Sequence, residues 1–286
     1  MSRKIALITG ATRGLGKFLA GRFWDAGLNL CLVARNEHDL RKTAAFLSER
    51  KDQKVSTFVC DLGDPALVSE LTAKIREHFH HLDVLVNNAA IQGPIGPLWE
   101  NDLLAWQQAV QVNLLSPVVL CRAFVPGMRE NGGGSIINLS GGGATGPRAN
   151  FSAYATAKGA LVRFSETLAE ETRHMGIRVN CIAPGAMKTD MLGEVLSKGA
   201  DSAGEREFVL ANKVFAEGGA SMDRVADLAL FLASDISAGI TGKLISAVWD
   251  PWESLPDHLE DLNGTDIYAL RRIVPKDRGK TWGNDA

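Results

Sequence analysis

Short apolar runs alternate with longer stretches of helical periodicity along most of the chain. Such runs occupy residues 4–9, 29–35, 55–61, 83–88, 135–140, 177–184 and 243–249. Nearly continuous apolar strands separated by helices are typical of a parallel sheet that is covered on both faces. Right-handed crossovers between such strands build a doubly wound sheet. The pattern therefore predicts an α/β fold with one doubly wound, seven-stranded and mainly parallel sheet.

The alternation ends near residue 250. No internal repeat, low-complexity tract or linker interrupts residues 1–250, whereas Trp249, Pro251, Trp252 and Pro256 break the pattern at its end. We predict one domain, 1–250, and a C-terminal extension, 251–286. The two tryptophans could cover a substrate pocket or pack on a neighbouring subunit, since aromatic side chains are enriched at interfaces. A solvated surface is expected for the basic residues Arg271, Arg272, Lys276, Arg278 and Lys280.

Composition excludes some classes of partner. Of the 286 residues 45% are apolar and 22% charged, and the formal net charge is −2. No positive field would attract nucleic acid or an anionic membrane, so neither is an expected partner. Arg13 and Lys17 lie where a signal peptide would have its cleavage region, and no run reaches the ~18 apolar residues of a spanning helix. We expect a cytoplasmic protein.

The residues that most often bind metals are not spaced as a metal site requires. The four cysteines, Cys31, Cys60, Cys121 and Cys181, lie far apart and form no C-x-x-C motif. They are expected to be small core residues in a reduced compartment. His78, His80 and His81 lie at the predicted end of a helix, where cations are favoured, and are expected at the surface. We predict no metal site.

A glycine-rich turn follows the first predicted strand and precedes a helical stretch. It reads Gly10-Ala-Thr12-Arg13-Gly14-Leu15-Gly16. Glycines allow the backbone to approach a pyrophosphate, while a helix N-terminus supplies free amide donors and a positive dipole. The spacing is G-x-x-x-G-x-G rather than G-x-G-x-x-G, but its position indicates a dinucleotide site.

Two arginines favour NADP over NAD. Arg35 ends the second predicted strand, where an acidic residue would normally bind the ribose 2′-hydroxyl, and Arg13 lies in the glycine turn. Guanidinium groups suit a 2′-phosphate because they are permanently charged and donate in a fork. Glu37 keeps NAD as the less favoured alternative.

Tyr154 and Lys158 are four residues apart in a predicted helix. Residues at this spacing share one face, and an ammonium near a phenol lowers the phenol pKa from its reference of roughly 10. Tyr154 would then donate and accept a proton near neutral pH. For an isolated Y-x-x-x-K, a packed tyrosine and a solvated lysine remain the simpler interpretation.

Taken together, these motifs resemble the short-chain dehydrogenase/reductase family, in its single-domain branch with a Rossmann-type fold. The resemblance extends from residue 4 to about 248. The matching positions are Thr9, Gly10, Gly14 and Gly16; Asp61 and Leu62; Asn87, Asn88, Ala89 and Ala90, where Ala90 replaces a glycine; Asn113; Tyr154 and Lys158; and Pro184, Gly185 and Thr189.

The resemblance implies hydride transfer between a nicotinamide cofactor and a small carbonyl or alcohol substrate. Tyr154 would exchange a proton with the substrate oxygen, Lys158 would hold the nicotinamide ribose, and Asn113 would anchor a water in a proton relay. Asp61 would bind the adenine ring, and the segment from Pro184 to Thr189 would hold the nicotinamide amide. The family also implies a homodimer or homotetramer.

One family residue is missing. The family usually has a serine 13 residues before the tyrosine, but Gly141 occupies this position and Ser140 comes one residue earlier. Ser140 could take the role if the glycines 141–143 turn it into the site. Alternatively, another donor supplies the hydrogen bond, with Ser152, Asn150 and Thr145 as weaker candidates.

Two other functions compete with the oxidoreductase. A cofactor-binding regulatory or scaffold protein could keep the fold with weak catalysis. A serine hydrolase needs G-x-S-x-G, which Asn138 disrupts before Ser140. Residues 191–222 lie where the family has substrate-covering helices, and their polar, glycine-containing part is expected to be a mobile lid.

Overall fold

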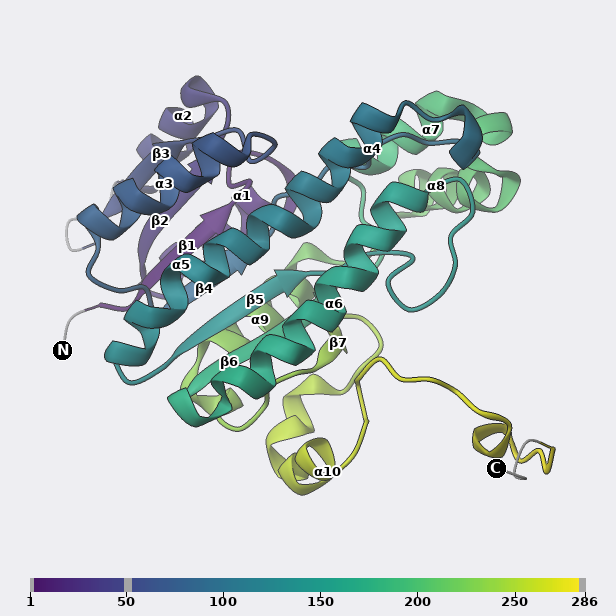
Figure 1. Cartoon of the computed structure of the whole chain (residues 1–286). Helices are drawn as coiled ribbons and strands as arrows, with labels where there is room; N and C mark the ends of the chain where they lie inside the picture. Colours follow the sequence, from purple (N-terminus) through teal and green to yellow (C-terminus); the bar gives the residue numbers. More distant parts are fainter. Residues whose placement is uncertain (1–2, 49–52, 283–286) are drawn as a thin grey trace.

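The computed structural model describes residues 3–48 and 53–282, and one parallel sheet runs through its centre (Figure 1). Its strands are β1 (Ile5–Thr9), β2 (Asn29–Ala34), β3 (Val55–Val59), β4 (Val84–Asn87), β5 (Gly134–Leu139), β6 (Ile177–Ala183) and β7 (Leu244–Ser246). They lie in the order β3-β2-β1-β4-β5-β6-β7, and each neighbouring pair is parallel. The predicted fold class is confirmed.

Helices cover both faces of the sheet. One face packs against α1 (Gly14–Asp25), α2 (Glu37–Leu47) and α9 (Met222–Ala233), and the other against α3 (Pro65–His78), α5 (Ser116–Glu130) and α6 (Ser152–Thr172). Strand β1 shows the alternation, since Ile8 belongs to the first apolar layer and Leu7 to the second. Each fully buried side chain of this size contributes about 1.5–3 kcal/mol. Apolar burial thus fixes both helical layers to the sheet.

The direction of winding reverses between β1 and β4. Strand β1 pairs with β2 on one side and with β4 on the other. The loops that leave β1 and β4 therefore diverge at the carboxyl edge of the sheet. In open α/β sheets, ligands bind at this point.

A continuous helical stretch of 28 residues runs from Leu103 to Glu130. It comprises α4 (Leu103–Val110), the π-helical turn η2 (Gln111–Leu115) and α5. Asp102 caps its start by accepting hydrogen bonds from the amides of Leu104 and Ala105. By length and composition it could cross a membrane, but its inner face packs on the sheet through Leu120, Phe124 and Met128. A core helix of a globular protein passes the same test.

Helices α7 (Asp190–Ala203) and α8 (Glu205–Glu217) form a cover at one end of α6, next to α4 (Figure 1). Val195 and Ala211 from this cover pack on Phe151, which is fully buried. Gly199, with φ 72°, breaks the helical geometry inside α7. The segment expected to be a lid is therefore mostly helical.

Part of the C-terminal extension packs against the main core. Trp252 is 5% exposed, and its ring centroid lies 5.4 Å from that of Phe231 in α9. Leu255 and Leu262 belong to the same apolar cluster. Trp252 is therefore a core residue, contrary to the expected pocket or interface role, whereas Trp249 is 75% exposed. Strand β7 ends early because the Ser246 side chain accepts the amides of residues 248 and 249.

Short helices complete the chain. They are η1 (Leu98–Glu100), η3 (Arg173–Met175), η4 (Asp235–Ser237), η5 (Trp252–His258), α10 (Leu259–Gly264) and η6 (Pro275–Arg278). After α10 the chain returns to the sheet, where the Tyr268 carbonyl accepts the Leu244 amide and the Leu270 amide donates to Glu166 in α6. Beyond these residues it leaves the body of the protein as an extended arm that carries η6 (Figure 1). The basic residues predicted to be solvated lie on this arm and are exposed.

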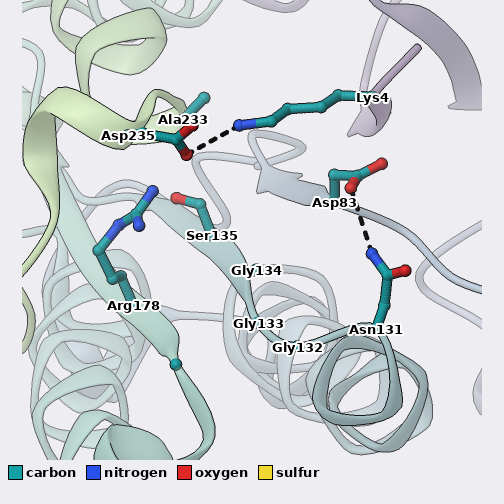
Figure 2. Close-up of a pocket in the computed structure, with 11 residues that line it drawn as sticks. Lys4, Asp83, Asn131, Gly132, Gly133, Gly134, Ser135, Arg178, Ala233 and Asp235 are labelled. Atoms are coloured by element: carbon teal, nitrogen blue, oxygen red, sulfur yellow. Dashed lines mark hydrogen bonds and ion pairs between the residues drawn. The ribbon is translucent and has the colours of Figure 1, made fainter. Parts of the chain in front are cut away.

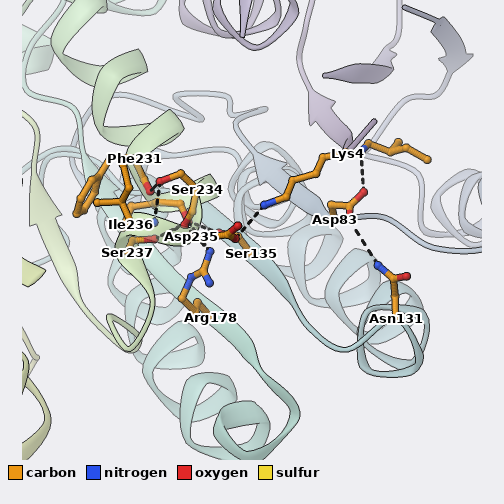
Figure 3. A network of polar contacts seen from close by, with 12 residues as sticks. Lys4, Asp83, Asn131, Ser135, Arg178, Phe231, Ser234, Asp235, Ile236 and Ser237 are labelled. Carbon is orange, nitrogen blue, oxygen red and sulfur yellow. Dashed lines mark hydrogen bonds and ion pairs between the residues drawn. The ribbon is translucent and has the colours of Figure 1, made fainter. Parts of the chain in front are cut away.

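A polar cavity of about 180 Å³ opens at the amino edge of the sheet (Figure 2). Lys4 forms a 2.9 Å ion pair with Asp235 there, and Asp83 accepts the Ile5 amide. The Arg178 guanidinium donates to the Leu232 and Ser234 carbonyls at the end of α9 (Figure 3). These bonds join the strand starts to the C-terminus of α9, at the edge opposite to the loops described next.

Candidate active site

The glycine turn between β1 and α1 needs glycine for steric reasons. Gly10 and Gly14 have φ values of 68° and 49°, which residues with a side chain rarely adopt. A Cβ on Gly16 would lie 2.1 Å from the Gly10 carbonyl oxygen and 2.4 Å from Nδ2 of Asn88. Only a residue without a side chain fits at this position.

Asn88 and Thr9 bind the turn to the loop after β4. The Asn88 side chain donates to the Thr9 carbonyl at 2.9 Å, and Thr9 Oγ1 accepts the amides of Asn88 and Ala89, each at 3.0 Å. Ala89 also lies 3.0 Å from where a Gly10 Cβ would be. The residues expected to stand beside the cofactor therefore meet in space, and Ala90 follows them.

The residues expected to recognise the adenosine half lie around the same turn. Arg35 is exposed at the end of β2, and it has no ion-pair partner among the described residues. Arg13 forms a 3.1 Å ion pair with Asp190. Asp61 is exposed after β3 and accepts the Gly63 amide, while Leu62 is buried and its carbonyl accepts from Ser116.

The loop after β6 approaches the glycine turn from the other side. Thr189 Cγ2 lies 3.9 Å from the position of a Gly14 Cβ. Pro184 is buried, and Gly185 has φ 78°, where a Cβ would lie 2.8 Å from Ala220. The expected nicotinamide segment is thus close to the turn.

Tyr154 and Lys158 both lie on the buried side of α6. Their relative exposures are 7% and 2%, and Lys158 Nζ is 5.7 Å from the Tyr154 ring centroid. Lys158 donates to the Leu139 carbonyl at the end of β5 at 2.7 Å. The alternative of a solvated lysine is wrong, because the ammonium is buried at the carboxyl edge of the sheet.

The pKa of Tyr154 does not follow the prediction from the sequence. Burial raises it above its ordinary value, and the charge that lowers it is the Arg148 guanidinium. Burial also lowers the pKa of Lys158 to about 8. The predicted lowering by Lys158 is therefore not found: desolvation outweighs nearby charges, and Lys158 itself is partly deprotonated at slightly alkaline pH.

Asn113 lies in the π-helical turn and is fully buried. Its side chain accepts the Ile91 amide at 2.9 Å and donates to the Ile91 carbonyl at 2.8 Å. Turns of this kind frequently occur at functional sites. Asn113 thereby fixes the loop after β4. The same loop carries Gln92, a candidate site residue that no sequence motif indicates. Gln92 is 3% exposed, and its Nε2 has no hydrogen-bond partner among the described residues.

Gly141 borders Tyr154 directly, as its spacing from the tyrosine suggests. A Cβ on Gly141 would lie 2.3 Å from the phenol oxygen of Tyr154. Ser140 is 3% exposed, and its hydroxyl is buried without a hydrogen-bond partner in the described structure. Of the weaker candidates, Thr145 is exposed and Ser152 accepts a hydrogen bond from Trp106. The backbone carbonyl of Asn150 accepts the Gly96 amide.

This edge of the sheet has the shape and donors that a dinucleotide requires. The glycine turn leaves no room for side chains, and α1 begins there with Arg13 as its N-cap, whose side chain forms no capping bond. Its first amides are therefore available to an anion. Tyr154 and Lys158 lie on α6 beside the end of β5, which is two strands from β1 in the sheet, at the same edge. The residues present thus fit a nicotinamide dinucleotide.

Comparisons with known proteins agree with this architecture. Residues 4–199 match the family model described as short chain dehydrogenase. An uncharacterized short-chain type dehydrogenase/reductase of Sinorhizobium fredii is 33% identical over 251 residues, which cover 85% of this chain and 94% of that relative.

Two solved structures share the fold. A Beutenbergia cavernae protein assigned as an NAD(P) dependent gluconate 5-dehydrogenase, with NADP bound at low occupancy, has a TM-score of 0.76 and 26% identity, covering 86% of this chain and 96% of its own. An NAD+-bound xylitol dehydrogenase has the same TM-score and identity, covering 85% and 96%. The chain belongs to the short-chain dehydrogenase/reductase family of oxidoreductases.

Proposed function

We propose that this protein is an NADP-dependent oxidoreductase that transfers a hydride between the nicotinamide and a carbonyl or alcohol substrate, with Tyr154 as general acid and base. The observation that carries this proposal is the position of Tyr154. Its phenol oxygen borders Gly141 at the carboxyl edge of the sheet, where the glycine turn also lies. The fold of the chain and the family to which it belongs are consistent with this function.

When bound, the dinucleotide supplies the hydride acceptor or donor. The protein supplies position and a proton. In the direction of reduction, Tyr154 Oη gives its proton to the carbonyl oxygen, and the product is an alcohol. In oxidation the same oxygen takes the proton from the alcohol. A buried phenol with a raised pKa is protonated at neutral pH, which favours the role of acid.

Lys158 and Asn113 support Tyr154 in this proposal. The 2.7 Å bond to the Leu139 carbonyl fixes the ammonium at the end of β5, where it would donate to the nicotinamide ribose. Asn113 holds the Ile91 backbone and so shapes the loop beside the substrate, and we propose that it is also part of the proton relay. The remaining contacts to the cofactor would come from the turn residues, Asp61, Asn88 and Thr189.

The preference for NADP rests on Arg35. It is an exposed cation at the end of β2, whereas Glu37 pairs with Arg41 at 2.6 Å and so has a partner. Arg13 would assist after release from Asp190. The solved relatives include one with NADP and one with NAD+, so the family alone does not decide between the two cofactors.

Ser140 is our proposed hydrogen-bond donor to the substrate oxygen. Its buried hydroxyl has no hydrogen-bond partner among the described residues, which costs about 1–3 kcal/mol unless a ligand or water satisfies it. Replacing one preorganised donor to a developing oxyanion typically costs 10²–10³-fold in kcat. Ser140→Ala should therefore lower kcat/KM at least tenfold with cofactor binding unchanged. A value within about threefold of the parent would assign the role elsewhere.

A second candidate function follows from Gly141. Without a serine at that position, the protein could bind the cofactor and catalyse only weakly, as a regulatory or scaffold protein. A screen of NADPH and NADH oxidation with a panel of aldehydes and ketones separates the two functions. The oxidoreductase is supported by turnover with at least one carbonyl, and the scaffold by tight NADPH binding without turnover.

We further propose a cytoplasmic homodimer or homotetramer. Leu103 and Leu104 at the start of α4 are 64% and 75% exposed, and association would remove this apolar surface from water. Light scattering on the purified protein gives the mass, and a monomer at micromolar concentration would contradict this part of the proposal.

A further inference from the structure

Arg148 lies in the loop between β5 and α6 and reaches across to the cover formed by α7 and α8. Its Nε and Nη2 donate to Oε2 of Glu207 in α8, at 3.0 and 2.7 Å. The two side chains are only 14% and 20% exposed. Hydrogen bonds between charged groups are stronger than neutral ones, and solvent screens a partly buried pair little. The pair therefore anchors α8 to the loop.

The same guanidinium contacts the aromatic rings at the start of α6. Its Cζ lies 3.8 Å from the ring centroid of Phe151 and 5.9 Å from that of Tyr154. Phe151 is fully buried and packs with Val195 of the cover. Arg148 is thus in contact with the cover and close to the tyrosine at once.

The glycine run after β5 lets Arg148 take this position. A Cβ on Gly143, whose φ is 92°, would lie 3.2 Å from the Arg148 Cβ and 2.6 Å from that of Ala155. A Cβ on Gly142 would lie 3.7 Å from Nη1 of Arg148. The side chain therefore crosses the turn that begins with Gly141, the neighbour of the Tyr154 oxygen.

We propose that Arg148 is a positioning residue that couples closure of the cover to the ionisation of Tyr154. The inference rests on the proposed role of Tyr154 as the proton donor. When the cover is closed, Glu207 partly neutralises the guanidinium. When it opens, Arg148 loses this partner and its full positive charge acts on the phenol.

Three charged groups among the described residues bear on Tyr154, directly or through a partner. Lys158 comes from α6 and Arg148 from the loop, and Glu207 acts through Arg148 from α8. Helix α4 (LLAWQQAV) and the π-helical turn (QVNLL), which pack beside α6, contain no ionisable residue. A change of charge at Arg148 or Glu207 should therefore be felt at Tyr154 with little compensation.

The composition of the chain allows a direct measurement. The protein has only two tyrosines, Tyr154 and Tyr268. In a Tyr268→Phe background, the ultraviolet absorbance of tyrosinate titrates Tyr154 alone, without substrate or cofactor. We would compare Arg148→Gln, Glu207→Gln and Arg148→Lys with the parent. Arg41→Gln, which removes the exposed ion pair with Glu37, is the matched control.

The expected order of the Tyr154 pKa values in these variants distinguishes coupling from loss of packing. Opening of the cover solvates Tyr154 in both glutamine variants alike, so their difference reports charge. The pKa of Tyr154 should be higher in Arg148→Gln, which lacks the cation, than in Glu207→Gln, which lacks the anion. Arg148→Lys should lie nearer the parent than Arg148→Gln does, and Arg41→Gln should match the parent.

Hydrogen exchange tests whether the pair of Arg148 and Glu207 holds the cover closed. Both glutamine variants should raise exchange rates across α7 and α8 about tenfold or more, because an ion-paired hydrogen bond to the cover is lost. The inference would be overturned if the pKa of Tyr154 were equal in the two glutamine variants or higher in Glu207→Gln. Unchanged hydrogen exchange in both variants would also overturn it. Failure of the proposed function would look different: the parent would oxidise NADPH with none of the panel of carbonyls, while the titration order could still hold.

Discussion

Gly141 and Tyr154 are in such close contact that no side chain fits between them: a Cβ on Gly141 would lie 2.3 Å from the phenol oxygen. Values below 3.0 Å are essentially never seen for real Cβ atoms, so any larger residue must displace the ring. The family's serine cannot simply be restored at this position. The tyrosine instead fills the space that such a serine would need.

Substitution of Gly141 should therefore reduce activity. Gly141→Ala and Gly141→Ser push Tyr154 out of place, and a misplacement of about 1 Å can cost roughly 10²-fold in rate. We expect kcat/KM to fall at least tenfold with both variants, while NADPH binding changes little. Gly146→Ala is the matched control, since a Cβ there meets nothing within 4 Å. Restored or improved activity in Gly141→Ser would show that the pocket accommodates the serine.

Arg35 should decide between the two cofactors. Hydrogen bonds to charged groups are worth about 1.5–3 kcal/mol, so Arg35→Ala should weaken NADPH binding about tenfold to a hundredfold. NADH, which has no 2′-phosphate, should bind the variant and the parent equally. Fluorescence titration at physiological salt measures both, with Arg129→Ala, an exposed arginine at the C-terminal end of α5, as the control. Equal affinities of the parent for NADH and NADPH would refute the preference for NADP.

Lys158 should make stability depend on pH in a defined window. Its pKa is about 8 in the folded protein against roughly 10.4 in an unfolded chain, so the unfolded chain binds more protons between these values. The cost of the buried charge is thus present below pH 8 and is lost as the pH rises toward 10. Lys158→Met should be more stable relative to the parent at pH 7 than at pH 10, by on the order of 2 kcal/mol.

Denaturant unfolding at a series of pH values measures this difference. The contributions of Cys31, Cys60 and Cys121 to the pH dependence of stability cancel between variant and parent. Lys74→Met on the exposed side of α3 should show no such trend. A stability difference independent of pH would mean that Lys158 stays charged in the fold.

The two tryptophans at the domain end should differ sharply in their effect on stability. Trp252→Ala removes a core side chain next to Phe231 and should lower the free energy of unfolding by about 3–5 kcal/mol. Trp249→Ala, at a position 75% exposed, should change it by less than about 0.5 kcal/mol. Similar losses for the two variants would contradict the packing of residues 252–262 on the main core.

Periodicity predicted the sheet well because parallel strands buried on both faces leave a local apolar signal. The run at 29–35 corresponds to β2 at Asn29–Ala34, and the run at 177–184 to β6 at Ile177–Ala183. The last run was overextended, since 243–249 contains only Leu244–Ser246 as strand. There the Ser246 side chain captures the following amides, which an apolar pattern does not reveal.

The site was predictable only where a motif is continuous in sequence. The glycine turn and the Tyr154–Lys158 pair are local, whereas Arg148 meets Glu207 across 59 residues. Nothing near Arg148 in the sequence indicates that partner. The pKa of Tyr154 was predicted in the wrong direction because spacing reports neighbouring charges but not desolvation, which here is the larger effect.

The most direct test of the account is the rate of hydride transfer in Tyr154→Phe, measured in a single turnover with NADPH and the best carbonyl from the panel. Loss of the general acid should slow this step at least 10²-fold, while the Kd for NADPH stays within about twofold of the parent. A rate equal to that of the parent, with the same cofactor affinity, would show that Tyr154 is not the proton donor.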